Sequence, residues 1–181
     1  MSTPHTYFPL DQKQFRQVLG TFVSGVTVVL TEVDGEIHGL TVNSFSSLSL
    51  DPPLILVCIA KIANTHPKLV VSQQFSVCIL ADDQREISSL FSKPQNDISG
   101  ILLSRIPQSP VPSIEGSLAA LWCEKTMQYE GGDHTLFIGR VVDMKVNHAK
   151  KPLVFYRGQY GHFHERSPFG SESTLGSKDI H

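Results

Sequence analysis

Short runs rich in β-branched residues recur along most of the chain, and turn signals separate them. Val26–Thr31 and Ile37–Val42 flank Asp34-Gly35, a pair that readily adopts the positive φ angles of a two-residue hairpin turn. Further strands are predicted at Leu54–Ile59, Phe75–Leu80, Leu118–Tyr129, Thr135–Val146 and Leu153–Tyr156. About seven short strands with few helices predict a mainly β fold, and a barrel in particular.

A few short helical patterns accompany these strands. Asp11 begins one in which apolar residues recur at helical spacing, namely Phe15, Val18, Leu19 and Phe22. In Asn64-Thr65-His66-Pro67 a capping side chain precedes a proline, which predicts a second helix start. Asp83 and Glu86 have the spacing of a capping box and predict a third helix.

One domain is predicted to occupy residues 11–164. Residues 1–10 are polar and carry two prolines, so we expect an N-terminal arm. Residues 165–181 are rich in Ser and Gly, so we expect a flexible C-terminal tail. Residues 94–116 hold four prolines and lack a periodic pattern, which predicts an excursion over the protein surface.

The composition supports a buried core and excludes several classes of function. Apolar residues make up 40% of the chain and charged residues 18%. The formal net charge of −2 does not build the basic surface of a nucleic-acid-binding protein. No apolar run reaches the ~18 residues of a membrane span, and the N-terminus lacks the pattern of a secretory signal. We therefore expect neither a nucleic acid nor a membrane as partner.

The cysteines indicate the redox compartment. Cys58, Cys78 and Cys123 are widely spaced, and each lies among apolar neighbours. This pattern is typical of buried thiols in a reducing cytoplasm rather than of a disulfide framework or a zinc site. We expect a cytoplasmic protein without a metal site.

The segment Gly39–Leu50 carries an unusual number of hydroxyl and amide side chains: Thr41, Asn43, Ser44, Ser46, Ser47 and Ser49. The strands predicted on either side of it are buried. A buried hydroxyl without a partner costs about 1–3 kcal/mol, so a polar group should meet this segment. A ligand with many acceptors, such as a phosphate or the edge of a heteroaromatic ring, would satisfy it. A Ser-rich edge strand that faces solvent explains the pattern equally well on chemistry alone.

Several motifs, taken together and in order, resemble the short-chain flavin reductase family. These proteins often serve as the reductase components of two-component flavin-dependent monooxygenases. The resemblance runs from about Phe15 to Phe163. Its motifs are TFVSGVTVV from Thr21, GLTVNSFSSLSLDPPL from Gly39, FSVCILADDQ from Phe75, LFS from Leu90, GDHTLFIGRV from Gly132 and PLVFYRGQY from Pro152.

The resemblance implies an antiparallel Greek-key split barrel with a few short flanking helices, assembled as a homodimer that binds flavin near the subunit interface. It implies contacts with the flavin ring and ribityl chain at Thr41, Val42, Asn43 and Ser44, with Ser46 and Ser47 beside them. It places the flavin phosphate near Ala60, Lys61, Asn64 and Thr65, and a further flavin contact at Phe91 and Ser92. A solvated loop lysine remains the alternative for Lys61, and a core position for Phe91.

His134 is the predicted catalytic residue, because the resemblance implies contact with the nicotinamide donor near the flavin. Hydride transfer requires the two rings to stack closely and no side-chain nucleophile, so His134 would act mainly by positioning. The residues alone also allow Asp133 and His134 to be a turn-stabilising pair. Tyr160 is predicted to line the same pocket, with a purely structural tyrosine as the alternative.

The sequence thus predicts an NAD(P)H-dependent flavin reductase that transfers hydride from NADH or NADPH to FMN or FAD and supplies a partner monooxygenase. A non-catalytic split-barrel flavoprotein, acting as an FMN-binding electron carrier or a ligand-binding module, is the alternative. No Gly-x-Gly-x-x-Gly motif follows a strand, which agrees with a nicotinamide that stacks on bound flavin instead of occupying a Rossmann site. Val42 and Ser24 depart from the family's usual residues.

Overall fold

The computed structural model describes residues 10–94 and 97–164. The predicted tail at 165–181 and all but the last residue of the predicted arm at 1–10 lie outside these residues. The elements in chain order are α1 (Gln12–Leu19), β1 (Ser24–Gly25), β2 (Thr27–Val33), β3 (Glu36–Val42), β4 (Phe45–Leu50), β5 (Pro53–Ala60), α2 (His66–Val71), β6 (Gln74–Ile79), α3 (Arg85–Phe91), β7 (Leu103–Ile106), β8 (Ser109–Ile114), β9 (Ala119–Gly131), β10 (His134–Val146), β11 (Leu153–Tyr156) and β12 (Gln159–His162).

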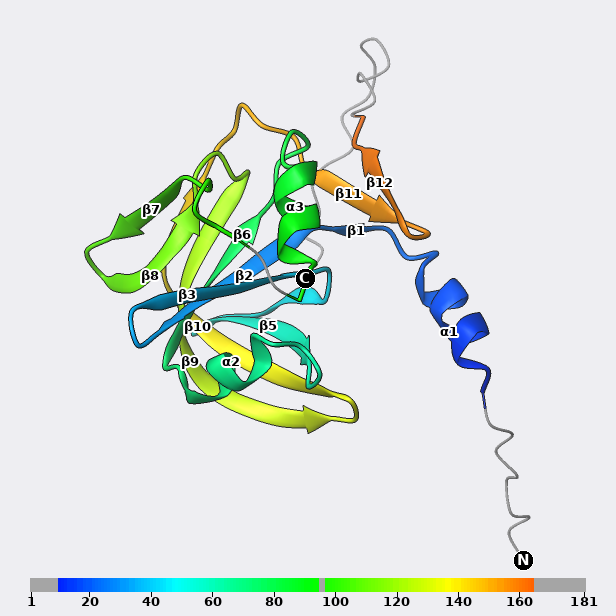
Figure 1. Cartoon of the computed structure of the whole chain (residues 1–181), viewed down its shortest axis with the longest axis horizontal. Helices are drawn as coiled ribbons and strands as arrows, with labels where there is room; N and C mark the ends of the chain where they lie inside the picture. Colours follow the sequence, from blue (N-terminus) through cyan, green and yellow to red (C-terminus); the bar gives the residue numbers. More distant parts are fainter. Residues whose placement is uncertain (1–9, 95–96, 165–181) are drawn as a thin grey trace, which may run out of the picture.

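The centre of the molecule is an antiparallel sheet in the order β3-β2-β6-β9-β10-β5-β4 (Figure 1). Its two edge strands, β3 and β4, are separated in the chain by Asn43 and Ser44 alone. Two residues span only about 7 Å, so the sheet must curl until its edges meet at this point. Ser44 joins the edges to β5, because its carbonyl accepts from the Cys58 N–H at 3.1 Å. The predicted split barrel is confirmed.

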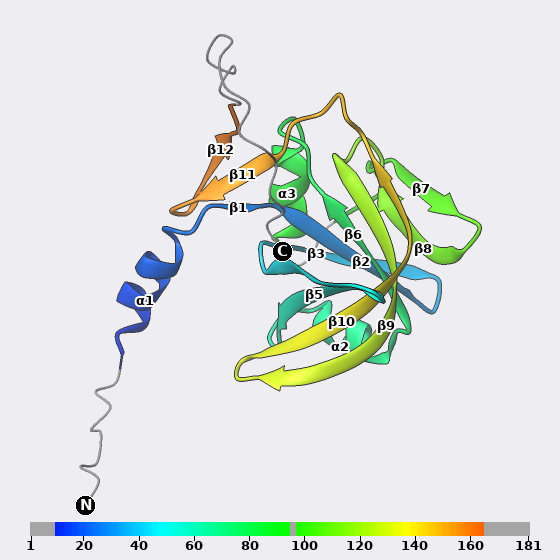
Figure 2. The ribbon, with the colours of Figure 1, turned by 180° about the vertical axis from the view of Figure 1, so that it is seen from behind.

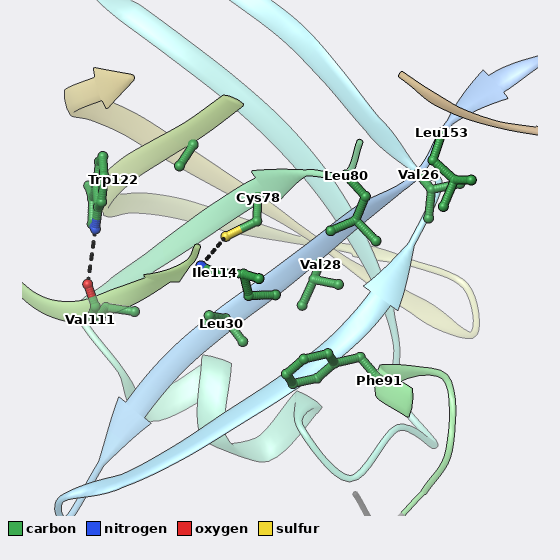
Figure 3. Packing of buried hydrophobic residues seen from close by; sticks show 11 residues of the cluster. Val26, Val28, Leu30, Cys78, Leu80, Phe91, Val111, Ile114, Trp122 and Leu153 are labelled. Atoms are coloured by element: carbon green, nitrogen blue, oxygen red, sulfur yellow. Dashed lines mark hydrogen bonds between the residues drawn. The ribbon is translucent and has the colours of Figure 1, made fainter. Parts of the chain in front are cut away.

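The strands β2 and β6 and the first half of β9 are buried on both faces, because the barrel has a core inside and a second core outside. Successive side chains of a strand point to opposite faces. Val29 and Val77 accordingly pack inside the barrel with Phe137 of β10. Cys78 and Trp122 belong to the outer core, which Figure 3 shows from close by.

Within the predicted surface excursion at 94–116, the strand β8 is instead largely buried, because it closes the outer core. Trp122 Nε1 donates to the Val111 carbonyl at 3.0 Å, and the Ile114 N–H contacts the Cys78 sulfur at 3.2 Å (Figure 3). Ser76 Oγ donates to the Pro112 carbonyl at 2.6 Å. Strand β8 contains prolines and pairs in its own sheet only with β7. Side-chain donors of the barrel thus supply hydrogen bonds to its backbone carbonyls. The local sequence carries no periodic sign of this docking.

Helix α1 begins where the sequence predicts but projects away from the barrel (Figures 1 and 2). Asp11 is its N-cap and accepts from the Lys13 N–H at 2.9 Å. The helix ends at Leu19, and none of its residues is buried. It is joined to the small sheet β1-β11-β12 by a hydrogen bond from the Arg157 N–H to the Gly20 carbonyl at 2.8 Å.

The other two predicted helices exist, but their predicted caps are wrong. Helix α2 has Thr65 at its N-cap and α3 has Gln84, and neither makes a side-chain capping bond. Asn64 instead donates to the Pro94 carbonyl at 2.7 Å, which ties the start of α2 to the segment after α3. Among the helices that the structure describes, none is long and apolar enough to cross a membrane.

Candidate functional site

A cleft of about 820 Å³ runs along the free edge of β3. The β3 edge forms one wall together with Asn43 and Ser44. The opposite wall comes from the loop before α2 and the end of α3, and the bottom from β5 and the first residue of β10. Of the predicted site residues, the following line it: Thr41, Val42, Asn43, Ser44, Ala60, Asn64, Thr65, Phe91, Ser92 and His134.

The backbone of β3 supplies hydrogen-bonding groups to this cleft. Asp34 and Gly35 adopt φ angles of 55° and 79°, and Val33 pairs with Glu36 to close the hairpin. In an antiparallel pair, only every second residue of a strand hydrogen-bonds to the neighbouring strand. Because Val33 and Glu36 form such a pair, the N–H groups of Gly39 and Thr41 point away from β2, toward the cleft. The Gly39 carbonyl lies on the same edge and accepts from Thr65 Oγ1 at 3.1 Å.

The hydroxyl groups of the predicted segment donate to the protein itself. Thr41 Oγ1 donates to the Ser88 carbonyl at 2.7 Å, and Ser44 Oγ donates to the Cys58 carbonyl at 2.6 Å. The expectation that unpaired side-chain hydroxyls require a ligand is therefore wrong for these two residues. Their oxygen lone pairs stay available as acceptors, while donors at this wall come from the backbone edge and the exposed amide of Asn43.

Small residues keep the cleft open beside bulky ones. A Cβ atom on Gly39 would lie 2.5 Å from Leu30 Cδ2 and 2.7 Å from Phe91 Cε1. Glycine is therefore required for the Phe91 ring to pack against β3. Ala60 and Ala63 line the opposite side with short side chains. The cleft thus lies between the strand edge, the loop before α2 and the end of α3.

His134 lies at the end of the cleft nearest β5. It is the first residue of β10 and pairs with Ala60, and its side chain is 41% exposed. Its Nδ1 is 2.8 Å from Asp133 Oδ1. This hydrogen bond and the charge of His134 lower the pKa of the exposed Asp133 carboxyl. With Nδ1 bonded to the carboxylate, Nε2 is the imidazole nitrogen left to meet a ligand.

Four predicted site residues lie outside the lining of this cleft. Lys61 Nζ donates to the Gly132 carbonyl at 2.8 Å and pairs with Glu130. Ser46 and Ser47 are exposed on β4. Tyr160 OH contacts Ser88 Oγ at 2.8 Å, while Arg85 lies over its ring at 5.2 Å. Tyr160 therefore contacts Ser88, the residue whose carbonyl accepts from Thr41.

The cleft also has lining residues that the sequence did not indicate. Glu36 and His38 extend it along β3, and Lys93 and Ile98 face them from beyond α3. Cys58 lies beneath Ser44, and partial burial raises the pKa of its thiol. No local motif marks these residues, because the topology of the barrel brings them together from separate segments.

The chemistry of this cleft fits a planar heteroaromatic ligand. Clefts of about 300–1,000 Å³ with apolar walls and a few convergent polar groups are typical small-molecule sites. Val42 and Leu40 supply apolar surface here, and a strand edge offers both N–H and C=O groups to the rim of a ring.

Comparisons with known proteins agree on one family. Residues 19–164 match the family model described as flavin reductase like domain. The reductase component of a 4-nitrophenol 4-monooxygenase/4-nitrocatechol 2-monooxygenase from Rhodococcus opacus is 36% identical over 86% of this chain and 83% of its own. An FMN reductase (NADH) from Agrobacterium fabrum is 37% identical over 90% of this chain and 94% of its own.

A solved structure has the same fold. The NADH:FAD oxidoreductase of Streptomyces globisporus C-1027, in complex with NAD and FAD fragments, superposes with a TM-score of 0.82. It is 35% identical in sequence, and the match covers 89% of this chain and 96% of that one.

Proposed function

The chain belongs to the flavin reductase-like family, and from this membership we propose that it is an NADH-dependent flavin reductase. The observation that carries the proposal is the cleft on β3, which is lined by most of the residues that the family resemblance predicts for flavin binding. Relatives at 35–38% identity are named as NADH-dependent reductases of FAD, of FMN or of flavin.

The residues of β3 would hold the flavin ring at the strand edge. The N–H groups of Gly39 and Thr41 and the Asn43 amide suit the ring's oxygen and nitrogen acceptors. The Thr41–Ser88 hydrogen bond fixes the strand to α3, so this wall is preorganised. Asn64 and Thr65 lie across the cleft, where the resemblance places the flavin phosphate.

His134 would position the nicotinamide, since it lines the cleft beside Ala60. The chemistry supplied by a bound flavin is acceptance of a hydride from C4 of NADH, with uptake of one proton and release of NAD⁺. The Asp133 carboxylate orients the His134 ring by holding Nδ1. Nε2 would then be the ring nitrogen available to contact the donor.

We propose that the reduced flavin passes to a monooxygenase component. Relatives from Rhodococcus and the flavin reductase of a Pseudomonas putida styrene monooxygenase are named as parts of such systems. The chain itself contributes an open cleft in which neutral groups dominate, so few charged contacts would retain a phosphate. Such a site suits a flavin that is bound, reduced and released.

We further propose that the protein is a homodimer in which α1 contacts a second copy. Phe15, Val18 and Leu19 are each more than half exposed on this helix. An isolated helix of this length is marginal in water, so an apolar face that no other described residue covers would be stabilised by a further surface. A two-fold dimer provides the contact reciprocally, with each α1 packed on the other chain.

A steady-state assay tests the proposed activity. The purified protein is mixed with NADH or NADPH and with FMN, FAD or riboflavin, and oxidation of the nicotinamide is followed. We expect flavin-dependent oxidation of NADH. Absence of flavin-dependent oxidation with every pair would refute the proposal. A protein that retains flavin through desalting but oxidises neither donor would support a non-catalytic flavoprotein instead.

A further inference from the structure

We propose that Lys61 is a positioning residue, which holds the turn between β9 and β10 and so sets the place of His134 for contact with NADH. This inference rests on the proposed flavin reductase function and adds a residue to it. It gives Lys61 a role different from the phosphate contact that the family resemblance implies.

His134 follows a turn at the end of a long hairpin. Strands β9 and β10 are 13 residues long each, and the turn between them extends beyond the rest of the barrel (Figure 2). Residues 126–133 are exposed, and the turn contains Gly131 and Gly132, the second with a φ angle of 72°. Glycine restricts the backbone least, and exposed residues pack little. Hydrogen bonds therefore have to fix this turn.

Lys61 supplies these bonds from the end of β5. Its N–H donates to the Asp133 carbonyl at 2.9 Å, one residue past the pair that Ala60 forms with His134. Its Nζ donates to the Gly132 carbonyl at 2.8 Å and pairs with the Glu130 carboxylate of β9. Lys61 thus connects β5 to three successive points of the hairpin just before His134.

The contacts of the Lys61 side chain point to the hairpin and not to the cleft. Both of its acceptors lie on the hairpin, and Lys61 is not among the residues that line the cleft. The loop before α2 lines the cleft with Asn64 and Thr65 instead. An exposed ion pair contributes little to the stability of a fold, so we expect the effect of Lys61 in the reaction and not in folding.

The effect reaches the imidazole through Asp133. The Asp133 carboxylate holds His134 Nδ1 at 2.8 Å, so a shift of the turn moves the imidazole with it. On the other side of His134, the buried Thr135 is held independently, because its Oγ1 lies 2.9 Å from His66 Nε2. Loss of the Lys61 side chain should therefore loosen the turn and leave the rest of β10 in place.

Steady-state kinetics and flavin titrations of variants test this inference. Lys61→Met removes the ammonium group and should lower kcat/KM for NADH about tenfold. This is less than full misplacement would cost, because the backbone bond to Asp133 remains. The dissociation constants of FMN and riboflavin should stay the same. Lys61→Arg should keep most of the activity, since a guanidinium group also donates to a carbonyl and a carboxylate. Lys150→Met, which breaks an ion pair with Asp83 outside the cleft, is the matched control and should change neither quantity.

The same substitution in the His134→Ala background separates positioning from a general structural effect. We expect no further loss there, because Lys61 acts through the missing imidazole. A further tenfold loss in that background, or an unchanged kcat/KM in Lys61→Met alone, would overturn the inference. Weaker binding of FMN with unchanged binding of riboflavin, which has no phosphate, would overturn it in favour of a phosphate contact. A wild-type protein that oxidises no NADH with any flavin would instead refute the proposed function.

Discussion

At the scale of single residues, the cleft on β3 is built from side chains that are fixed by the protein and backbone groups that are left free. Thr41 and Ser44 donate to carbonyls of α3 and β5, so their hydroxyls hold the strand in place. The strand edge then presents its own N–H groups. Because side-chain hydrogen bonds hold the strand and its backbone groups stay free, this wall of the cleft is rigid before a ligand binds.

His134→Ala tests the proposed role of the imidazole. We expect kcat/KM for NADH to fall about a hundredfold, the order of loss that follows from misplacing reacting groups by about 1 Å. The dissociation constant of flavin should stay the same, since His134 lies at the end of the cleft. His148→Ala, at an exposed position outside the cleft, is the control. Equal loss of both quantities, or of neither, would show that the assigned role is wrong.

Gly39→Ala tests the packing of β3 against Phe91. The new methyl would lie 2.5 Å from Leu30 Cδ2, so we expect the free energy of unfolding to fall by about 1–3 kcal/mol. Displacement of Phe91 should also weaken flavin binding. Gly161→Ala is the matched control, because nothing lies within 4 Å of its added Cβ. Chemical denaturation of the two variants gives the comparison, and similar stabilities would contradict this account of the site.

At the scale of elements, strands β6 and β9 bury one thiol each on opposite faces of the sheet. Burial raises the pKa of Cys78 to about 11 and that of Cys123 to about 12. A thiol in the unfolded chain has an ordinary pKa of 9.0, so the unfolded state loses protons first as the pH rises. This contribution to stability is complete below pH 9.0 and is lost between there and about 11 to 12.

The expected result is a free energy of unfolding that falls with pH in this window, by up to about 1.4 kcal/mol per pH unit for each thiol. Denaturant titrations at a series of alkaline pH values measure it. In the Cys78→Ala, Cys123→Ala double variant the fall should be shallower, because the two most deeply buried thiols no longer titrate. Identical slopes for the two proteins would contradict the burial of these thiols.

The strands of the barrel could be predicted from the sequence, because their signals are local. Val26–Thr31 is rich in β-branched residues, and Asp34-Gly35 adopts the turn that its φ preferences favour. The strand β8 could not be predicted, because Pro110 and Pro112 break the pattern and the groups that hold it are distant. Ser76 and Trp122 donate to its carbonyls from β6 and β9.

The candidate site also contains residues that local sequence signals predict and residues that they do not. The segment from Thr41 to Ser44 was visible, since its polar residues interrupt an apolar pattern. His38, Cys58 and Ile98 were not, because they lie in segments without a distinct signal and meet only when the sheet curls. Lys61 was predicted to lie near the flavin phosphate because its side chain is a cation. In the structure its ammonium group donates to the Gly132 carbonyl and pairs with Glu130.

At the scale of the whole molecule, the projecting helix α1 predicts assembly. Replacement of Phe15 and Val18 by Ser removes two of the three exposed apolar residues of this helix and should convert a dimer into a monomer in sedimentation velocity experiments. A Gln14→Ser, Gln17→Ser double variant changes the same helix at polar positions and should remain dimeric. A wild-type protein that sediments as a monomer, or a dimer that survives the loss of Phe15 and Val18, would contradict the proposed contact.

The central claim is that flavin occupies the cleft along β3, and hydrogen–deuterium exchange with and without saturating FAD tests it most directly. We predict slower exchange for the amides of residues 36–44, 60–65 and 91–93, the three segments that form its walls. The groove between α1 and the β11–β12 turn offers another opening on the molecule. Protection confined to that groove, or unchanged exchange along β3 with FAD bound, would contradict the account.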